Sequence, residues 1–129
     1  MSRGRVLLLE DDVALRGLLE EALLSEGFRV ITCESFTDIR AAAAAHAGDV
    51  IVADFWGGSQ RTLTEAARNE IRELTSLLPL ILLTGRTWAA STTAAELGAR
   101  ALIRKPFDLD ELLATVGAAF QEEETEPSS

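Results

Sequence analysis

Short, mostly apolar segments recur along the chain and alternate with longer stretches of helical periodicity. Runs of four or five such residues predict β-strands, and strands that are apolar on both faces are typical of a sheet buried on both sides. The segments expected to form strands are 6–9, 29–33, 50–54, 80–83 and 101–104. Strands of this kind need helices to cover both faces of the sheet.

The stretches between the strands predict helices, and the first of them carries apolar residues at helical spacing: Leu15, Leu18, Leu19, Ala22 and Leu23. Further helices are expected through 41–45, over about 62–77, over about 87–97 and from about 109 to 122. Ser35 or Thr37 is expected to cap the second helix, and Asp108 the last. Gly27 and Gly98 are expected just past the ends of the first and fourth helices.

This alternation of strand and helix predicts one α/β domain with a five-stranded parallel sheet between two layers of helices. We expect the strand order 2-1-3-4-5 of flavodoxin-like (βα)5 three-layer sandwiches. The ligand crevice of that topology lies at the carboxyl edge of the sheet, where the first and third strands are neighbours. The domain is expected over residues 1–122, and the acidic segment 123–129 is expected to be a disordered tail.

Composition narrows the class of protein. The chain has 129 residues, 47% of them hydrophobic, which suits one domain with its own core. Its net charge of −9 repels nucleic acid and anionic membrane surfaces at long range, so direct nucleic-acid binding is not expected. No apolar run approaches the roughly 20 residues that span a bilayer. With Cys33 as its single cysteine, the chain has no internal disulfide, and we expect a cytoplasmic protein without membrane insertion.

Acidic, hydroxyl and amine side chains stand at the ends of four of the predicted strands. Glu10 and Asp11 follow the first strand, Asp54 ends the third, Thr84 follows the fourth and Lys105 follows the fifth. Because parallel strands end at one edge, the three acids predict a divalent-cation site, and Mg²⁺ prefers such oxygen ligands. Asp11 and Asp54 would bind the metal directly, and Glu10 directly or through water. Asp54 is also a candidate nucleophile toward phosphate, with Lys105 and Thr84 holding the phosphoryl group.

The four strand-end motifs together resemble the receiver domain of bacterial two-component response regulators. The matching stretches are 7–12, 50–54, 82–85 and 104–107, and the resemblance covers about residues 3–122. It implies a Mg²⁺-dependent signalling switch and not an enzyme with a separate substrate. Such a switch takes its phosphoryl group from a histidine kinase or a histidine phosphotransfer protein. It then alters the binding of a downstream protein, which the sequence does not identify.

The same resemblance implies a role for each site residue. Asp54 would be the phosphoacceptor, and Glu10 and Asp11 the metal-binding pair. The backbone carbonyl of Trp56 would be a further metal ligand. Asp12 lies just after the acidic pair, and we interpret it as a helix cap and not as a ligand.

Further roles concern how the signal leaves the site. The resemblance implies that Thr84 is the switch hydroxyl and Lys105 the contact to phosphate. It also implies that the signal leaves through the fourth helix, the fifth strand and the last helix. Leu102 stands where the family has an aromatic switch residue, and Gly57-Gly58-Ser59 replaces its usual Pro-Gly turn. Output through an aromatic rotamer is therefore not expected.

Three alternatives stay open at the level of sequence. A phosphatase or phosphotransferase of the haloacid-dehalogenase type also uses an Asp after a strand, but it needs a second Asp where this chain has Trp56. A flavodoxin needs a hydroxyl-rich phosphate loop after its first strand, where 10–12 is wholly acidic. A degenerate receiver would be a constitutive interaction module, which the altered loop and Leu102 allow.

Overall fold

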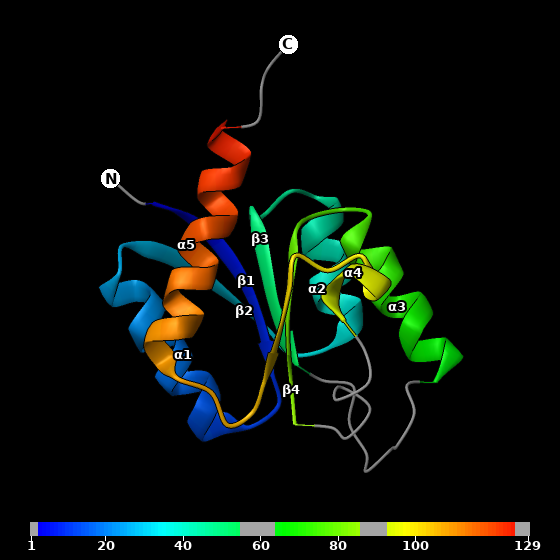
Figure 1. Cartoon of the computed structure of the whole chain (residues 1–129), viewed down its shortest axis with the longest axis horizontal. Helices are drawn as coiled ribbons and strands as arrows, with labels where there is room; N and C mark the ends of the chain where they lie inside the picture. The colour runs from blue at the N-terminus through cyan, green and yellow to red at the C-terminus, as the bar shows by residue number, and fades with distance from the viewer. Residues whose placement is uncertain (1–2, 55–63, 86–92, 126–129) are drawn as a thin grey trace.

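A computed structural model of the chain describes residues 3–54, 64–85 and 93–125 (Figure 1). The strands are β1 (Gly4–Glu10), β2 (Phe28–Cys33), β3 (Val50–Asp54), β4 (Leu80–Thr84) and β5 (Ala101–Arg104). The helices are α1 (Val13–Ser25), α2 (Phe36–Ala44), α3 (Glu65–Thr75), α4 (Ala94–Leu97) and α5 (Leu109–Thr125). Among these helices, none is long and apolar enough to cross a bilayer.

The strands form one parallel sheet in the order β2-β1-β3-β4-β5, which confirms the predicted topology. The direction in which strands are added reverses at β1: β2 lies on one side of β1, and β3, β4 and β5 follow in order on its other side. In this arrangement the ends of β1 and β3 lie side by side at the carboxyl edge, although they are far apart in the sequence.

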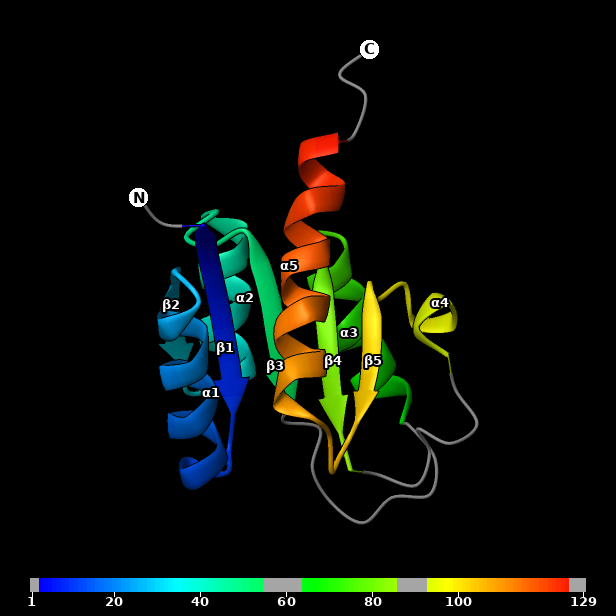
Figure 2. The ribbon, with the colours of Figure 1, turned by 60° about the vertical axis from the view of Figure 1, so that its left-hand side comes forward.

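Two hydrophobic cores lie on opposite faces of the sheet, because successive side chains of a strand point to opposite faces. Val6 and Leu8 of β1 pack on the face that α1 and α5 cover. Leu7 and Leu9 pack on the face that α2, α3 and α4 cover. All four are essentially inaccessible to solvent. Figure 2 shows α1 and α5 side by side in front of the sheet, with α2 and α3 behind it.

The predicted caps largely agree with the structure. Gly27 has a φ of 94° and Gly98 a φ of 74°, in the left-handed region that glycine tolerates. Of the two candidate caps for α2, it is Ser35 whose hydroxyl accepts a hydrogen bond from the backbone N–H of Asp38. The Asp108 carboxylate accepts from the N–H of Asp110 and so caps α5.

Several helix boundaries differ from the expected ones, including the end of α3, which lies at Thr75 and not at about 77. The fourth helix was expected from about Thr87, but Thr93 has an extended backbone and caps α4, so this helix begins at Ala94. The Thr93 hydroxyl accepts a hydrogen bond from the backbone N–H of Glu96, and α4 therefore does not extend toward the N-terminus beyond this cap. Residues 86–92 lie outside the described part of the chain. In the same way Thr64 caps α3, which begins at Glu65 instead of about 62, and α5 continues three residues past the expected end at 122.

Candidate functional site

The parallel register of the sheet brings the strand-end residues to one edge. Glu10 at the end of β1 is paired with Asp54 at the end of β3. Thr84 at the end of β4 accepts a hydrogen bond of 2.7 Å from the backbone N–H of Lys105, which follows β5. The four residues therefore share the carboxyl edge because their strands do, as the topology predicted.

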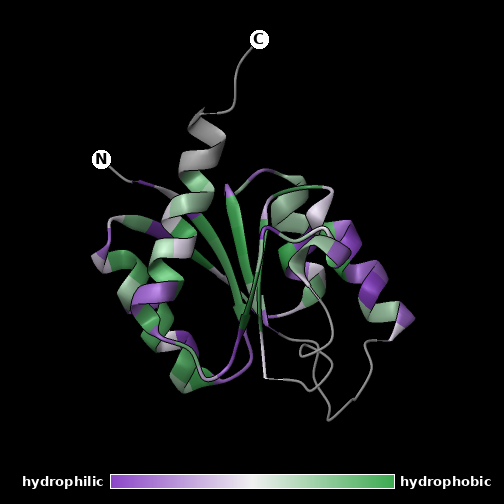
Figure 3. Ribbon diagram, in the orientation of Figure 1, coloured by the Kyte–Doolittle hydropathy of each residue, from purple (hydrophilic) through white to green (hydrophobic). Residues whose placement is uncertain are grey.

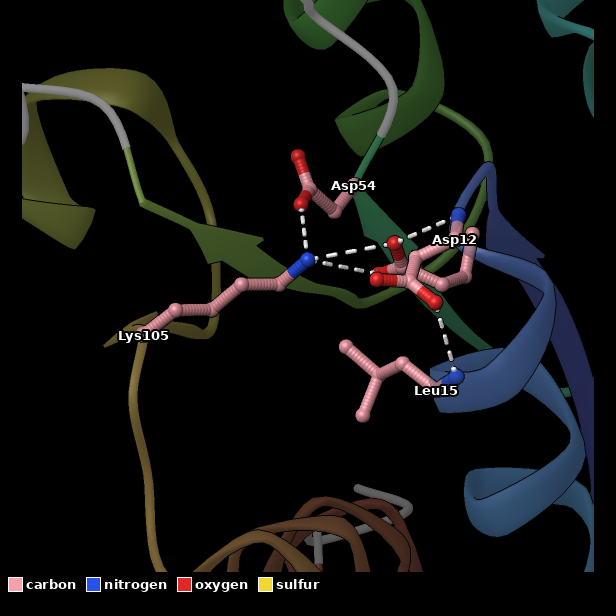
Figure 4. Close-up of polar contacts among 5 residues, drawn as sticks. Asp12, Leu15, Asp54 and Lys105 are labelled. Carbon is pink, nitrogen blue, oxygen red and sulfur yellow. Dashed lines mark hydrogen bonds and ion pairs between the residues drawn. The ribbon is translucent and has the colours of Figure 1, made fainter.

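Lys105 lies between two carboxylates of this edge. Its Nζ atom is 2.5 Å from Oδ2 of Asp54, and Figure 4 shows the side chain reaching across to that carboxylate. The same Nζ atom donates to both oxygens of Glu10, at 3.1 Å and 3.0 Å. One ammonium group thus neutralises part of the charge of two acids that are 44 positions apart in the sequence.

Glu10 is fully buried, and its carboxylate is held from two sides. Besides the bonds from Lys105, its Oε1 atom accepts from the backbone N–H of Asp12 at 3.1 Å. The Asp12 carboxylate in turn accepts from the N–H of Leu15 at 3.0 Å and caps α1 (Figure 4). Asp12 is therefore a helix cap, as the sequence predicted, and its backbone also helps to orient Glu10.

Burial and charge pairing oppose each other at this cluster. Burial raises the pKa of Glu10 above its ordinary value, and the hydrogen bond from Lys105 only partly offsets this. For Lys105, burial alone would lower the pKa, but the bonds to Asp54 and Glu10 outweigh it and raise the pKa. The ammonium form is therefore the stable one, and it is the counter-charge that allows the Glu10 carboxylate to stay buried.

Asp11 lies outside this ion cluster. It follows the last residue of β1 and is exposed, whereas its neighbour Glu10 points inward. Within 3–54, 64–85 and 93–125, no three acidic, histidine or cysteine side chains come together as a ready-made cation site. The position between Glu10 and Asp54 is instead taken by the Lys105 ammonium group.

The carboxylate oxygens at this edge nevertheless suit a hard divalent cation as ligands. Glu10 and Asp54 supply carboxylate oxygens, and Asp11 lies one residue away with its side chain in solvent. Mg²⁺ binds oxygen ligands and usually keeps several waters, so it needs few protein ligands. The ammonium group of Lys105 is itself a cation held by two of these carboxylates, which is direct evidence that the edge accommodates positive charge.

Two other residues singled out in the sequence have described positions. Thr84 is buried, with 2% of its surface exposed, at the end of β4. Leu102 lies in the middle of β5, beside Leu82 of β4, and is half-buried against the core that α2, α3 and α4 cover. Trp56 and the loop 57–59 lie outside the described residues, so the expected carbonyl ligand stays a prediction.

An apolar surface beside the site was missed at the level of sequence. Val13 is 69% exposed and Leu18 51% exposed on the outer side of α1. A groove of about 450 Å³ beside Leu18 is lined mostly by apolar residues of α1, of the turn before α5 and of the start of α5, together with Asp12 and Lys105: Ala14, Leu15, Leu18, Pro106, Phe107 and Leu109. Figure 3 shows α1 as largely hydrophobic, in contrast to the hydrophilic α3. The apolar residues Val13, Leu18 and Leu24, which lie outside the buried stripe of α1, are the sequence signal that could have revealed it.

Comparison with known proteins agrees with this fold. Residues 6–117 match the family model of the response regulator receiver domain. The DNA-binding transcriptional regulator NtrC of Salmonella typhimurium is 33% identical over 121 residues, which cover 93% of this chain and 25% of NtrC. The regulatory protein VirG of Agrobacterium tumefaciens is 34% identical over 118 residues, covering 90% of this chain and 43% of VirG. The chain thus spans about a quarter of the length of the NtrC relatives it matches.

Solved structures show the same likeness. A transiently phosphorylated "switch" in bacterial signal transduction has 31% sequence identity and a TM-score of 0.72, and the match covers 98% of this chain and 100% of that one. The beryllofluoride-activated NtrC receiver domain has 30% identity and a TM-score of 0.66, with 95% and 98% covered.

The sheet order and the charged carboxyl edge define a flavodoxin-like signalling domain. The chain belongs to the response regulator receiver domain family, and it is a phosphorylation-dependent signalling switch of two-component systems. Domains of this family interact with histidine kinases. Nothing in the fold or in the relatives favours a phosphatase, a flavodoxin or a degenerate module.

Proposed function

We propose that Asp54 accepts a phosphoryl group from a phosphohistidine of a histidine kinase or of a histidine phosphotransfer protein. A carboxylate oxygen of Asp54 attacks phosphorus, the P–N bond to the imidazole breaks, and an acyl phosphate forms. The observation that carries this proposal is the Lys105 ammonium group bound to Asp54 at the carboxyl edge of the sheet. Its charge favours the anionic carboxylate that has to attack.

Mg²⁺ is proposed as the cofactor of this transfer. Glu10, Asp11, Asp54 and the backbone carbonyl of Trp56 would hold it. When bound, the metal supplies positive charge that reduces the repulsion between the carboxylate and the anionic phosphoryl group. The proposal includes only phosphorylation and loss of phosphate at Asp54 itself, without turnover of a separate substrate. A cytoplasmic location stays a prediction from the sequence.

Lys105 and Thr84 would bind the transferred group. The Lys105 ammonium group contacts a phosphoryl oxygen, and the buried hydroxyl of Thr84 donates to another. Because Thr84 is joined to Lys105 through its backbone carbonyl, a movement of one strand end reaches the other. The altered surface would be α4, β5 and α5, with Leu102 repacking where related domains have an aromatic ring.

The apolar outer side of α1 would be the surface that meets the phosphodonor. It borders the groove formed with Pro106 and Phe107, and Lys105 lies at the same place. A helix that carries the phosphohistidine could pack there with its apolar side and hold the imidazole above Asp54. Gly17 leaves room for close approach, because nothing lies within 4 Å of the position of a Cβ atom there.

Phosphorylation by a small phosphodonor tests the assignment of Asp54 without a partner. With acetyl phosphate and Mg²⁺, intact-mass measurement should show one added phosphoryl group in the wild type and none in Asp54→Asn. Asp49→Asn is a matched control, because Asp49 lies at the opposite edge of the sheet in a pair with Arg5. Equal labelling of wild type and Asp54→Asn would contradict the assignment.

A further inference from the structure

A second apolar stripe runs along α1, separate from the groove that Leu18 lines. Val13 is 69% exposed and Leu24 53% exposed, and Gly17 lies between them along the helix. At about 100° per residue, these three positions fall within about 40° of each other around the helix axis, whereas Leu18 lies about 100° or more away. We propose that this stripe packs against the same stripe of a second copy of the chain, with the two α1 helices antiparallel.

The spacing of the stripe is the first argument for a helix as its occupant. Steps of four and then seven residues separate Val13, Gly17 and Leu24, which is the 3.5-residue period of a seam between two packed helices. A two-fold axis between residues 18 and 19 places Val13 against Leu24 of the partner subunit at both ends of the contact. Gly17 lies near the axis, where no atom within 4 Å of the position of a Cβ atom hinders close approach.

The charges beside the stripe are the argument for a second copy. Glu20 accepts a hydrogen bond of 2.7 Å from the Thr32 hydroxyl of β2 through Oε2, so its Oε1 atom remains for another donor. Arg16 lies one turn earlier on the same side of α1, and its guanidinium forms no ion pair with any residue that the structure describes. The same two-fold axis brings Arg16 close to the partner's Glu20, and it does so twice in each dimer.

The dimer is expected to be weak. One pair of short helices buries little surface, and the net charge of −9 on each copy opposes association. We therefore expect a dissociation constant on the order of 100 µM. The proposed phosphodonor would also approach over Gly17, so dimer and donor would compete for α1. Only this consequence rests on the proposed function.

Sedimentation equilibrium of the chain at rising concentration tests the proposal. We expect a monomer–dimer equilibrium that Leu24→Asp weakens by about tenfold or more, because it places a carboxylate in an apolar contact. Leu18→Asp adds the same charge at an equally exposed leucine on the groove side, and should change the constant less than about threefold. Equal effects of the two variants would overturn the proposal. A monomer at every concentration would also overturn it and leave the stripe to another protein, such as the phosphodonor.

Charge exchange tests the antiparallel register. Arg16→Glu and Glu20→Arg should each weaken self-association, because like charges then meet across the two-fold axis. Glu21→Arg is the matched control, since it makes the same change of net charge one residue away from the ion pair. By lowering the acidic repulsion between copies, it should leave the dimer as strong as the wild type or stronger.

A mixture of the two weakened variants gives the sharpest result. Arg16→Glu and Glu20→Arg should associate with each other more tightly than either does with itself, because every introduced charge then meets an opposite one. Mixed dimers no tighter than the two homodimers would overturn the register, and with it the proposal.

The outcome is distinguishable from a failure of the proposed function, because acetyl phosphate needs no docking surface on α1. Labelling of Asp54 in a protein that stays monomeric would overturn the dimer and leave phosphorylation intact. A dimer with the expected variant effects, in a protein that acetyl phosphate does not label, would do the reverse.

Discussion

Opposite charges meet at both ends of the sheet, three of them at the carboxyl end and two at the amino end, but their environments differ. At the carboxyl end, the side chains of Lys105, Glu10 and Asp54 are 23%, 0% and 12% exposed. At the amino end, Arg5 and Asp49 form a salt bridge of 3.2 Å with 40% and 38% of their side chains exposed. Charges at the surface remain solvated, so an ion pair there contributes little to the stability of the fold. A buried charge that loses its partner destabilises the protein strongly, because no water replaces the partner.

The amino end relies on packing instead. The rings of Phe28 and Phe120 stack with centroids 5.2 Å apart, and the Arg3 guanidinium lies 4.5 Å from the centroid of Phe28. This packing joins α5 to β2 without any buried charge. The amino end is therefore held together by packing, without a buried ion cluster like that at the carboxyl edge. Replacing such a cluster by apolar residues is often neutral or stabilising, so its presence here points to function.

The largest effect is expected from breaking the buried cluster. In metal-free buffer, Lys105→Met should destabilise the protein by about 3–5 kcal/mol, because it leaves the Glu10 carboxylate buried without a counter-charge. Urea unfolding gives the value. The double variant Glu10→Gln/Lys105→Met should recover much of the loss, since a neutral amide needs no counter-charge. A double variant no more stable than Lys105→Met would contradict this explanation.

Alkaline pH should weaken the same cluster gradually. The pKa of Lys105 is raised above 10.5 in the folded protein, so its contribution to stability is complete below pH 10.5 and is lost as pH rises through the folded value. Burial also raises the pKa of the Cys33 thiol above 9.0, which adds a loss above pH 9.0. The chain has no tyrosine, so few other groups titrate there.

Two variants separate these contributions. Urea unfolding between pH 9 and 12 should show a loss of stability in Cys33→Ala that is absent in Cys33→Ala/Lys105→Met. A loss of equal size in both proteins would exclude Lys105 as its source.

Packing at the amino end can be tested with glycines. A Cβ atom at Gly4 would overlap the ring of Phe120, and the φ of 146° also disfavours other residues. Gly4→Ala should therefore destabilise the protein by about 1–3 kcal/mol in thermal or urea unfolding. Gly17→Ala is the matched control, because it lies on α1 with no atom near the new methyl group. It should stabilise by up to about 1 kcal/mol through helix propensity.

The two ends also differ in how far the sequence predicts them. The strands, their order and the gathering of Glu10, Asp54, Thr84 and Lys105 at one edge follow from local hydrophobic patterns and from the topology of parallel sheets. The central strands β1, β3 and β4 are buried on both faces along most of their length, so their positions in the chain are unambiguous.

Side-chain pairing was not predictable in the same way. Lys105 and Glu10 are 95 positions apart, and the choice of Glu10 over Asp11 as its partner depends on which acid is the last residue of β1. The Arg5–Asp49 pair and the Phe28–Phe120 stack likewise depend on how distant elements pack. No local pattern encodes such contacts. The start of α4 was missed for a different reason, because the Thr93 cap competes with continuation of the helix.

The smallest effect is expected at the exposed pair, and its sign is opposite to that at the buried acid. Burial alone would raise the pKa of Asp49, but the hydrogen bonds from Arg5 outweigh it and lower the pKa below 3.8. Its contribution is thus present above pH 3.8 and lost as pH falls through the folded value. The pKa of Glu10 is raised above 4.5 by burial, so ionising this acid reduces stability as pH rises from 4.5 toward its folded value.

The pH dependence of the free energy of unfolding tests this contrast in metal-free buffer between pH 3 and 6. Asp49→Asn should remove only the weak loss of stability toward low pH, and Glu10→Gln should remove the loss of stability above pH 4.5. Urea unfolding of the wild type and both variants measures these slopes. If Asp49→Asn changes the pH profile more than Glu10→Gln does, then the contrast between an exposed and a buried ion pair is wrong.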